Sequence, residues 1–239
     1  MTEALFRDDA NLLACEAVIS AVSEAGIALD RSVFYPQGGG QAGDAGWLRR
    51  DDGAELVIVD TRKGAEPDSI LHLPLPGTDL SGWQAGQRVQ AVIDADRRMA
   101  HRRFHTATHL LCALVPHPVD GCSITASYAR LDFHMTEPLD KATLSAGIAR
   151  LMAAAHPVRQ RWISEAELDA NPSLVRSMSV QPPRGAGQVR LVEVVGIDLQ
   201  PCGGTHVDNT ADIGAVVVTK IEKKSAKTRR VVLGFAEIA

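Results

Sequence analysis

The chain has 239 residues, of which 45% are hydrophobic and 23% are charged, and this composition excludes an intrinsically disordered protein. Its formal net charge of −4 argues weakly against nucleic acid as a partner, although such binding depends on local basic surfaces rather than on the average. The four cysteines do not have the spacing of a disulfide framework, and the N-terminus is acidic. No apolar run approaches the roughly 20 residues that span a bilayer. These features predict a cytoplasmic protein without membrane contact.

The first 95 residues are rich in turns and in predicted strands. Residues 55–60 and 87–94 are predicted strands, and apolar and polar residues alternate clearly in the second. The segment 32–48, SVFYPQGGGQAGDAGWL, precedes both and has five glycines between positions 38 and 46. This density of glycine predicts a loop with unusual backbone angles between two strands. We therefore expect residues 1–95 to form a β-rich domain.

The pattern changes near residue 96. Asp94 or Asp96 is the expected N-cap of a long helix that Pro116 ends. Further helices are predicted at 141–156 and directly after Ser164, and strands at 128–135, 157–164, 188–197, 214–225 and 229–238. These elements predict a second domain of α+β type over residues 96–239.

Two histidines, His105 and His109, lie four residues apart in RRFHTATHLL, within the long predicted helix. This spacing places both imidazoles on one helix face, one turn apart, where they can reach a common metal ion. Pairs of this kind commonly bind zinc. Because the pattern is short, two hydrogen-bonded interior histidines are the alternative. No glutamate follows His105, so the HExxH pattern of metalloproteases, which contains its own general base, is absent.

A second pair, Cys202 and His206, lies four residues apart in CGGTH. Pro201 and the two glycines predict a turn, which lets a thiolate and an imidazole converge. Three neutral imidazoles and one thiolate are a reasonable zinc-binding set, so the two pairs together predict one zinc site. Four protein ligands close a tetrahedral site, whereas catalytic zinc usually keeps one position open. A weak ligand, a five-coordinate state and a purely structural zinc therefore all stay open.

Two groups of basic residues could provide the local positive surface that a nucleic acid requires. The first precedes the histidine pair and consists of Arg97, Arg98, Arg102 and Arg103. The second lies near the C-terminus and consists of Lys220, Lys223, Lys224, Lys227, Arg229 and Arg230. Solvated faces without a partner are the alternative for each group. Their position near the predicted metal site favours a role in binding.

Four segments together resemble the editing domain of alanyl-tRNA synthetase and, more specifically, its freestanding relatives, the AlaX trans-editing proteins. These segments are FYPQGGGQAGDAG, RRFHTATHLL, ARLDF and DLQPCGGTHVDNTADIGAVVVTKIEKKSAKTRRV, and they occur in this order over most of the chain. The glycine-rich segment is typical of the medium-length class. The resemblance implies an α+β fold in which a small β-barrel-like domain precedes a zinc-bearing editing domain, of the type called the threonyl/alanyl-tRNA synthetase second additional domain.

The resemblance also implies an activity: hydrolysis, in trans, of tRNA(Ala) mischarged mainly with serine, with glycine as the second candidate. A pocket built for alanine cannot strongly exclude either amino acid by binding alone, so a second hydrolytic site is required. The four zinc ligands of the family correspond to His105, His109, Cys202 and His206. The acceptor end of tRNA(Ala) is the implied partner, and Lys220, Lys223, Lys224, Lys227, Arg229 and Arg230 are expected to contact its phosphates, with the upstream arginines helping.

Two pairs of glycines are candidates for substrate contact. In the family, the glycine-rich loop, here with Gly39 and Gly40, lies near the editing pocket and shapes selectivity. The backbone N–H groups of Gly203 and Gly204 could stabilise the oxyanion of a tetrahedral intermediate, since glycine allows close approach of a backbone. The alternative is that Gly203 and Gly204 only permit the turn.

A polar side chain must distinguish serine from alanine. The family places this selector on the strand that follows the zinc-binding helix, and Thr125 is the candidate here. Ser123 and Ser127 are alternatives because the match is loose at this point. A threonine that simply suits a strand is the other interpretation.

Two other functions stay open. One is a non-catalytic tRNA-binding module with a structural zinc, and the other is an editing enzyme for mischarged threonine tRNA, whose synthetase has a related HxxxH and CxxxH fold. The GGGQ and RLDF segments favour the alanine line. The preference between serine and glycine and the oligomeric state, monomer or homodimer, are left open by the sequence.

Overall fold

The computed structural model describes residues 1–66, 68–178 and 187–236, and the chain separates into two compact units. Unit 1 comprises Met1–Gly38 and Ala42–Met99, and unit 2 comprises Gly39–Gln41 and Ala100–Ala239. The short segment Gly39–Gln41 thus belongs with unit 2, although both of its neighbouring segments belong to unit 1. The sequence did not predict that Gly39–Gln41 belongs with unit 2. The assignment of 1–95 and 96–239 as domains stays a prediction.

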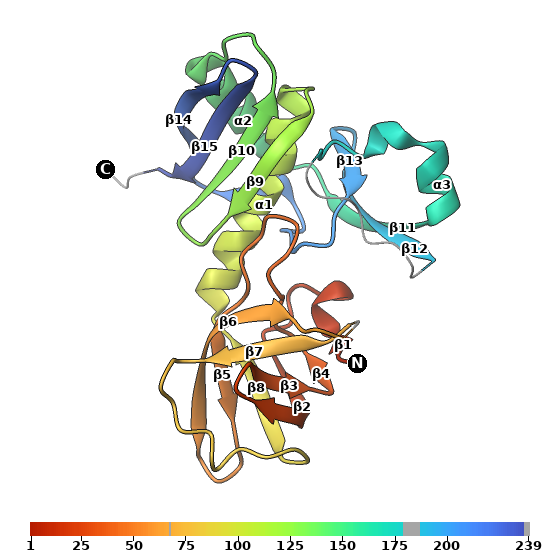
Figure 1. Ribbon diagram of the computed structural model, residues 1–239. Helices are drawn as coiled ribbons and strands as arrows, with labels where there is room; N and C mark the ends of the chain where they lie inside the picture. The colour runs from red at the N-terminus through yellow and green to blue at the C-terminus, as the bar shows by residue number, and fades with distance from the viewer. Residues whose placement is uncertain (67, 179–186, 237–239) are drawn as a thin grey trace. The chain divides into compact units, whose positions relative to one another are not determined.

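Six strands of unit 1 form a closed antiparallel barrel in the order β2-β3-β7-β6-β5-β8 (Figure 1). The strands are β2 (Ala14–Ser23), β3 (Gly26–Leu29), β5 (Gly46–Arg49), β6 (Glu55–Lys63), β7 (Ile70–Pro74) and β8 (Arg88–Ile93). In β8, Val89, Ala91 and Ile93 are buried while Arg88 and Gln90 are exposed, because successive side chains point to opposite faces of a strand. The predicted β-barrel is therefore confirmed.

The glycine-rich segment joins β4 (Arg31–Ser32) to β5, and β4 pairs in parallel with β1 (Glu3–Ala4), which η1 (Leu5–Arg7) follows. Gly39 and Gly40 have φ angles of 58° and 86°, in the left-handed region that glycine tolerates. The prediction of a loop with unusual backbone angles is confirmed. The helix that follows the barrel also holds this loop, because the Arg97 guanidinium donates to the carbonyl oxygen of Gly43.

Helix α1 (Ala95–Leu114) contains the division between the units. Of the two candidate N-caps, Asp94 is correct: its carboxylate accepts a hydrogen bond from the backbone N–H of Arg97 at 3.0 Å. The helix ends before Pro116, as predicted, since proline cannot continue the hydrogen-bonded ladder. Its buried side within unit 2 includes Leu110 and Leu111.

A four-stranded antiparallel sheet is the larger sheet of unit 2, in the order β14-β15-β10-β9 (Figure 1). The strands are β9 (Val119–Ile124), β10 (Tyr128–His134), β14 (Val216–Ser225) and β15 (Thr228–Phe235). Helix α2 (Lys141–Ala153) contacts β14, and α1, α2 and one sheet face share a core that includes Leu110, Ile148, Phe133 and Val231. The predicted strands 128–135 and 214–225 are confirmed, and the predicted helix 141–156 is confirmed but ends at Ala153. The predicted strand 229–238 is confirmed up to Phe235, and its residues 237 and 238 lie outside the described part of the chain. Strand β9 was not predicted.

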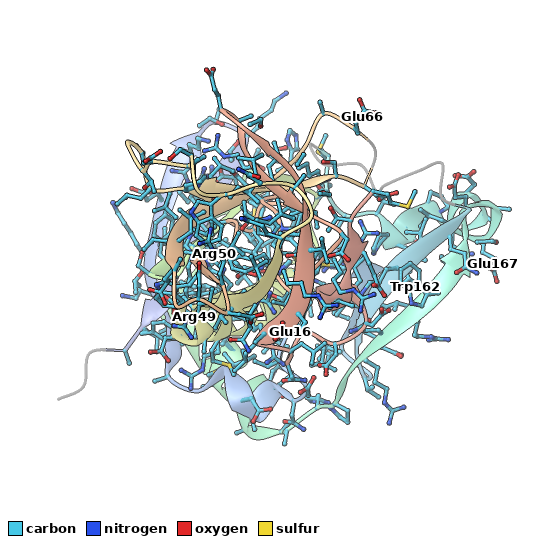
Figure 2. All side chains as sticks on the ribbon, turned by 90° about the horizontal axis from the view of Figure 1, so that it is seen from below. Glu16, Arg49, Arg50, Glu66, Trp162 and Glu167 are labelled. Carbon is cyan, nitrogen blue, oxygen red and sulfur yellow. The ribbon has the colours of Figure 1, made fainter. Side chains whose placement is uncertain are left out.

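A three-stranded sheet completes unit 2, in the order β11-β12-β13, with strands β11 (Val158–Ser164), β12 (Gln188–Val194) and β13 (Asp198–Pro201). The predicted strand 188–197 was too long, because Gly196 adopts a φ of 76° and the chain turns back to form β13. After β11 come α3 (Glu165–Ala170) and η2 (Pro172–Leu174), and η3 (Thr210–Ile213) precedes β14. Ser164 forms a capping box with Glu167, which is labelled with Trp162 of β11 in Figure 2.

Candidate metal centre

Helix α1 supplies the first half of a side-chain cluster. His105 and His109 lie on the same face of the helix with ring centroids 5.6 Å apart, and both are buried. This is the arrangement that the four-residue spacing predicts. The chain that follows β13 packs against this face, since Sγ of Cys202 lies 3.4 Å from Nε2 of His105.

Strand β13 leads directly into the second half of the cluster. Residues 202–207 form an irregular turn, as the two glycines predicted, and it carries Cys202 and His206. The buried Arg190 on β12 holds this turn, since its guanidinium donates to the carbonyl oxygens of Cys202 and Gly204, at 2.9 Å each. The hairpin at Gly196 therefore decides where the turn and its two side chains lie.

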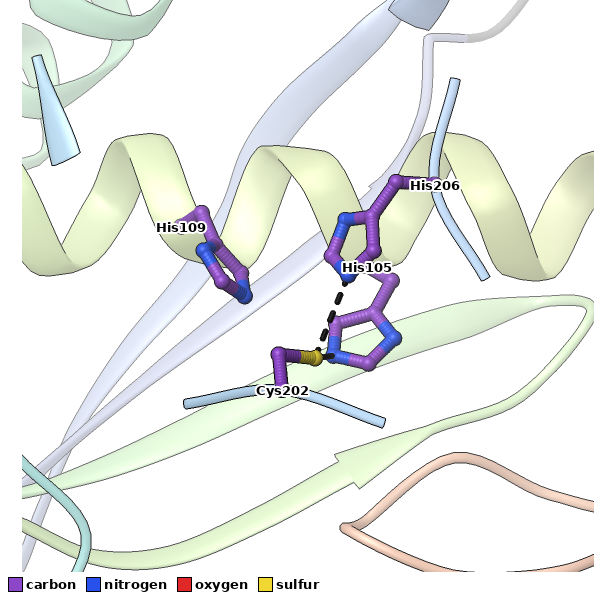
Figure 3. A group of neighbouring side chains, drawn as sticks. All are labelled: His105, His109, Cys202 and His206. Atoms are coloured by element: carbon purple, nitrogen blue, oxygen red, sulfur yellow. Dashed lines mark hydrogen bonds between the residues drawn. The ribbon is translucent and has the colours of Figure 1, made fainter. Parts of the chain in front are cut away.

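The four side chains converge on one point, as Figure 3 shows. The Sγ atom of Cys202 lies 3.4 Å from Nε2 of His105 and 3.2 Å from Nε2 of His206. One ligand atom from each of the four residues lies within 4.8 Å of the others. Ligand atoms around a tetrahedral zinc, with bonds of about 2.0–2.3 Å, are separated by roughly 3.3–3.8 Å. The cluster is thus a possible metal-binding site made of the two pairs that the sequence singled out.

The second ring nitrogen of each imidazole has an acceptor within the protein. The Nδ1 atom of His109 lies 2.9 Å from Oδ2 of Asp198, and an ionised carboxylate can only accept. The Nδ1 atom of His206 lies 3.2 Å from the hydroxyl of Thr106, which gives its single hydrogen to the carbonyl oxygen of Arg102. Both Nδ1 atoms therefore donate, so the nitrogen left to face the centre of the cluster is Nε2 in each ring.

Mutual electrostatics favour the ligand forms of two of these side chains. Burial alone would raise the pKa of the Cys202 thiol, but the neighbouring His105 and His206 hold it well below its ordinary value. Burial and the nearby His105 lower the pKa of His206 well below its ordinary value. A thiolate and a neutral imidazole are the species that bind a metal ion.

His109 behaves differently because a carboxylate faces it. Burial acts to lower its pKa, yet hydrogen bonds with Asp198 and Cys202 raise that pKa to about 9. A metal ion that binds at neutral pH must therefore displace a proton from His109.

Two of the residues that accept hydrogen bonds from the imidazoles of the cluster were not predicted. Gln41 accepts a hydrogen bond from Nδ1 of His105 at 2.8 Å, and Asp198 accepts one from His109. Asp198 had a usable signal, since it lies four residues before Cys202 on an extended segment, where alternate side chains share a face. Gln41 had none, because 64 residues separate it from His105.

The two glycines of the turn have different surroundings. A Cβ on Gly204 would lie 2.1 Å from Cε1 of His105, whereas a Cβ on Gly203 would meet nothing within 4 Å. The backbone N–H of Gly204 is directed to Sγ of Cys202 at 3.4 Å. Gly204 is thus required by packing, and the exposed Gly203 is the member of the pair with free space around it.

Thr125 lies in the turn between β9 and β10 and not on a strand, which corrects its expected position. Its hydroxyl accepts from the backbone N–H groups of Ser127 and Tyr128 and donates to the carbonyl oxygen of Tyr128. These bonds stabilise the turn, as threonine hydroxyls often do. The role of Thr125 as the selector for serine stays a prediction.

The basic residues near the C-terminus divide into three groups. Arg229 is buried and donates to the carbonyl oxygens of Glu137, Ser225 and Thr228, so its position is that of a structural residue. Arg230 and Lys224 both pair with Asp132. Exposed lysines remain at Lys220, Lys223 and Lys227, and the first of these pairs with Glu222.

Two of the four arginines before the histidine pair are not surface residues, contrary to the expectation that they help to bind phosphate. Arg98 is 1% exposed and pairs with the buried Asp44 in unit 1. Arg102 is 3% exposed, and its Nε donates to the carbonyl oxygen of His206 at 2.6 Å. Both guanidinium groups are held inside the protein because they satisfy buried acceptors.

Comparison with known proteins identifies the family. Residues 5–97 match the family model described as tRNA synthetases class II (A), and residues 189–232 match the one described as threonyl and alanyl tRNA synthetase second additional domain. The chain is 35% identical over 239 residues to the alanyl-tRNA editing protein AlaX-M of Methanosarcina acetivorans, which covers 96% of this chain and 97% of that protein. This chain belongs to the AlaX-M family.

Other relatives agree with this assignment. The AlaX-M protein of Saccharolobus solfataricus is 30% identical over 236 residues, or 97% of this chain and 98% of that protein. The alanine–tRNA ligase of Archaeoglobus fulgidus is 32% identical over 230 residues, which is 92% of this chain but 24% of the ligase. The AlaX resemblance and the predicted second additional domain are thus confirmed. Among the described residues, no helix has the length and apolar character needed to cross a membrane.

Proposed function

We propose that this AlaX-M chain is an alanyl-tRNA editing deacylase, which hydrolyses the ester bond of tRNA(Ala) mischarged mainly with serine, and secondarily with glycine. The observation that carries the proposal is the convergence of three imidazole Nε2 atoms and one thiolate in a member of this family. The name of its relatives, alanyl-tRNA editing protein, supports tRNA(Ala) as the substrate tRNA. Serine and glycine are the proposed amino acids, because a pocket built for alanine cannot exclude either by binding alone.

The proposed cofactor is one zinc ion per chain, held by His105, His109, Cys202 and His206. The donor set suits zinc, which accepts both imidazole nitrogen and thiolate sulfur. The hydrogen bonds that the three Nδ1 atoms donate suit it as well, because they leave Nε2 of each ring facing inward. Zinc in this set would act as a Lewis acid toward the ester carbonyl or the attacking water.

The residues of the turn supply the remaining chemistry in this proposal. Attack of water on the aminoacyl ester produces a tetrahedral oxyanion, and the ribose hydroxyl leaves. The backbone N–H of Gly203 is the better donor to that oxyanion, because the N–H of Gly204 is directed to Cys202 Sγ. Gly39 and Gly40 remain proposed neighbours of the substrate, and Thr125 remains the proposed selector for the serine hydroxyl.

The acceptor stem is proposed to lie along the exposed lysines Lys220, Lys223 and Lys227. A flexible ammonium group is suited to phosphate as a point charge. Lys224 and Arg230 would attract phosphate less strongly than these lysines, because both pair with the carboxylate of Asp132.

A deacylation assay tests the proposed function. Purified protein is incubated with seryl-, glycyl- and alanyl-tRNA(Ala) and with seryl-tRNA(Thr), before and after treatment with a chelator and after zinc is restored. We expect rapid loss of the seryl ester, slower loss of the glycyl ester, little loss of the alanyl ester, and activity that zinc restores. Protein that contains zinc but leaves all four esters intact would instead be a tRNA-binding module, and a preference for seryl-tRNA(Thr) would place it in the threonine line.

A further inference from the structure

Gln41 is fully buried, although glutamine is usually a surface residue. The segment that carries it extends the edge of the four-stranded sheet of unit 2, because Ile124 N donates to the carbonyl oxygen of Gly40 at 2.8 Å and Gln41 forms a parallel bridge with Ile124. A Cβ on Gly40, at its φ of 86°, would lie 2.8 Å from Sγ of Cys122. Only glycine at position 40 allows the segment to approach β9 so closely.

Three hydrogen bonds determine how the side-chain amide of Gln41 is oriented. The backbone N–H of Thr205 lies 3.1 Å from one terminal atom of the amide, and because this group can only donate, that atom is the oxygen Oε1. The Nδ1 atom of His105 lies 2.8 Å from the same oxygen and must therefore donate to it. The other terminal atom, Nε2, donates to the hydroxyl of Thr205 at 3.0 Å.

Two consequences follow for the metal centre. With its proton on Nδ1, the imidazole of His105 presents the lone pair of Nε2 to the point where the four ligands converge. Thr205 precedes His206 directly, so the same amide that orients His105 also binds the turn that carries Cys202 and His206. One side chain thus joins the helix with two ligands to the turn with the other two.

We propose that Gln41 is a positioning residue for the metal centre: it holds His105 in the metal-binding tautomer and fastens the CGGTH turn to helix α1. The inference rests on the metal-dependent function proposed above. It gives the glycine-rich segment a task at the metal centre: Gly40 lets the chain reach the sheet edge, and Gln41 then reaches the ligands.

The chemistry of the side chain predicts which substitutions are tolerated. Gln41→Leu keeps most of the volume but removes all three hydrogen bonds. Gln41→Glu keeps an oxygen that accepts from both His105 and Thr205, and the rotatable Thr205 hydroxyl can then donate to the carboxylate. Gln41→Asn keeps the amide but is one methylene too short to reach both partners. Gln37, which is exposed on the same loop, provides the matched control Gln37→Leu.

The experiment measures zinc affinity by competition with a chromophoric chelator and records the absorption spectrum of the cobalt(II)-substituted protein. We expect Gln41→Leu and Gln41→Asn to weaken zinc binding about 10–100-fold, the range for partners of metal-ligating histidines. Both variants should also alter the cobalt spectrum, which reports ligand geometry. Gln41→Glu should stay within a few-fold of the wild type, and Gln37→Leu should not differ from it.

Zinc affinity and a cobalt spectrum equal to those of the wild type in Gln41→Asn would overturn the proposal. Loss in Gln41→Glu equal to that in Gln41→Leu would also overturn it, because an oxygen that accepts from His105 and Thr205 would then not be what holds the site. If Gln41→Leu does not fold, the comparison of Gln41→Asn with Gln41→Glu decides the question alone. A wild-type protein that binds zinc but does not deacylate tRNA would refute the proposed function without touching this result.

Discussion

The Oδ2 atom of Asp198 lies 2.9 Å from Nδ1 of His109, and both side chains are buried. Burial would raise the pKa of Asp198, but the hydrogen bond with His109 holds it below its ordinary value. The second oxygen lies 3.5 Å from the Arg176 guanidinium. A carboxylate that stays ionised beside a metal-ligating histidine makes its Nε2 a stronger donor to the metal. His109 is thus the histidine of the cluster with an anionic partner.

Replacing Asp198 tests this partnership. We expect Asp198→Asn to weaken zinc binding about 10-fold or more, because the amide lacks the negative charge that strengthens His109 as a ligand. Chelator competition measures the change. Asp208→Asn serves as the control, since the side chain of Asp208 is 72% exposed. Equal zinc affinities of the two variants would show that the charge of Asp198 does not act on the metal.

The two glycines of CGGTH should respond in opposite ways to alanine. Gly204→Ala places a methyl group 2.1 Å from Cε1 of His105 and should abolish stable zinc binding, because either His105 or the turn must move. Gly203→Ala meets no atom within 4 Å and should keep zinc. Metal content after gel filtration distinguishes the two. A Gly204→Ala protein that retains one zinc per chain would contradict the packing argument.

Thr125→Val tests the proposed selector. If the hydroxyl recognises serine, the variant should lose activity on seryl-tRNA(Ala) about 10-fold or more while activity on glycyl-tRNA(Ala) stays near that of the wild type, since only serine presents a hydroxyl. The hydrogen bonds of Thr125 within the turn suggest a second experiment, the thermal stability of the same variant. Equal losses on both substrates would assign Thr125 to the turn alone.

The exposed lysines should govern the salt dependence of activity. Replacement of Lys220, Lys223 and Lys227 by alanine should raise KM for tRNA and leave zinc content and kcat near their wild-type values. The slope of log KM against log salt should fall by about 3, at roughly 0.9 for each lost phosphate contact. Lys63→Ala, at an exposed lysine of the barrel, is the control. An unchanged slope in the triple variant would remove these lysines from the tRNA-binding surface.

Asp132 should make stability depend on pH. Burial acts to raise its pKa, but hydrogen bonds from Arg230 and Lys224 lower that pKa to about 2. A carboxyl whose pKa is lowered by folding stabilises the folded state fully at pH values above its unfolded-state pKa of about 3.9. This contribution is lost as the pH falls toward 2. We expect Asp132→Asn to lower the free energy of unfolding by about 2 kcal/mol at pH 7. Urea titrations should show a smaller difference at pH 3, and a constant difference would refute the linkage.

The sequence by itself determined the features that depend on neighbours along the chain. The spacing of His105 and His109 placed both on one helix face, because 3.6 residues make one turn. Two glycines and a proline made CGGTH a turn, and alternation in 87–94 identified a barrel strand. The AlaX resemblance added the barrel, which the strand order confirmed, and the family, which the relatives confirmed.

Only the tertiary structure decided which distant groups meet. The hairpin at Gly196 brings Asp198 and Cys202 to α1, and Gln41 reaches Thr205 across 164 positions of the chain. Likewise, Arg229 is an interior residue although the sequence shows it as one charge in a basic run. Periodicity reports which face a side chain occupies. The partner of that side chain depends on which segments the folded chain brings together to bury apolar surface and satisfy buried polar groups.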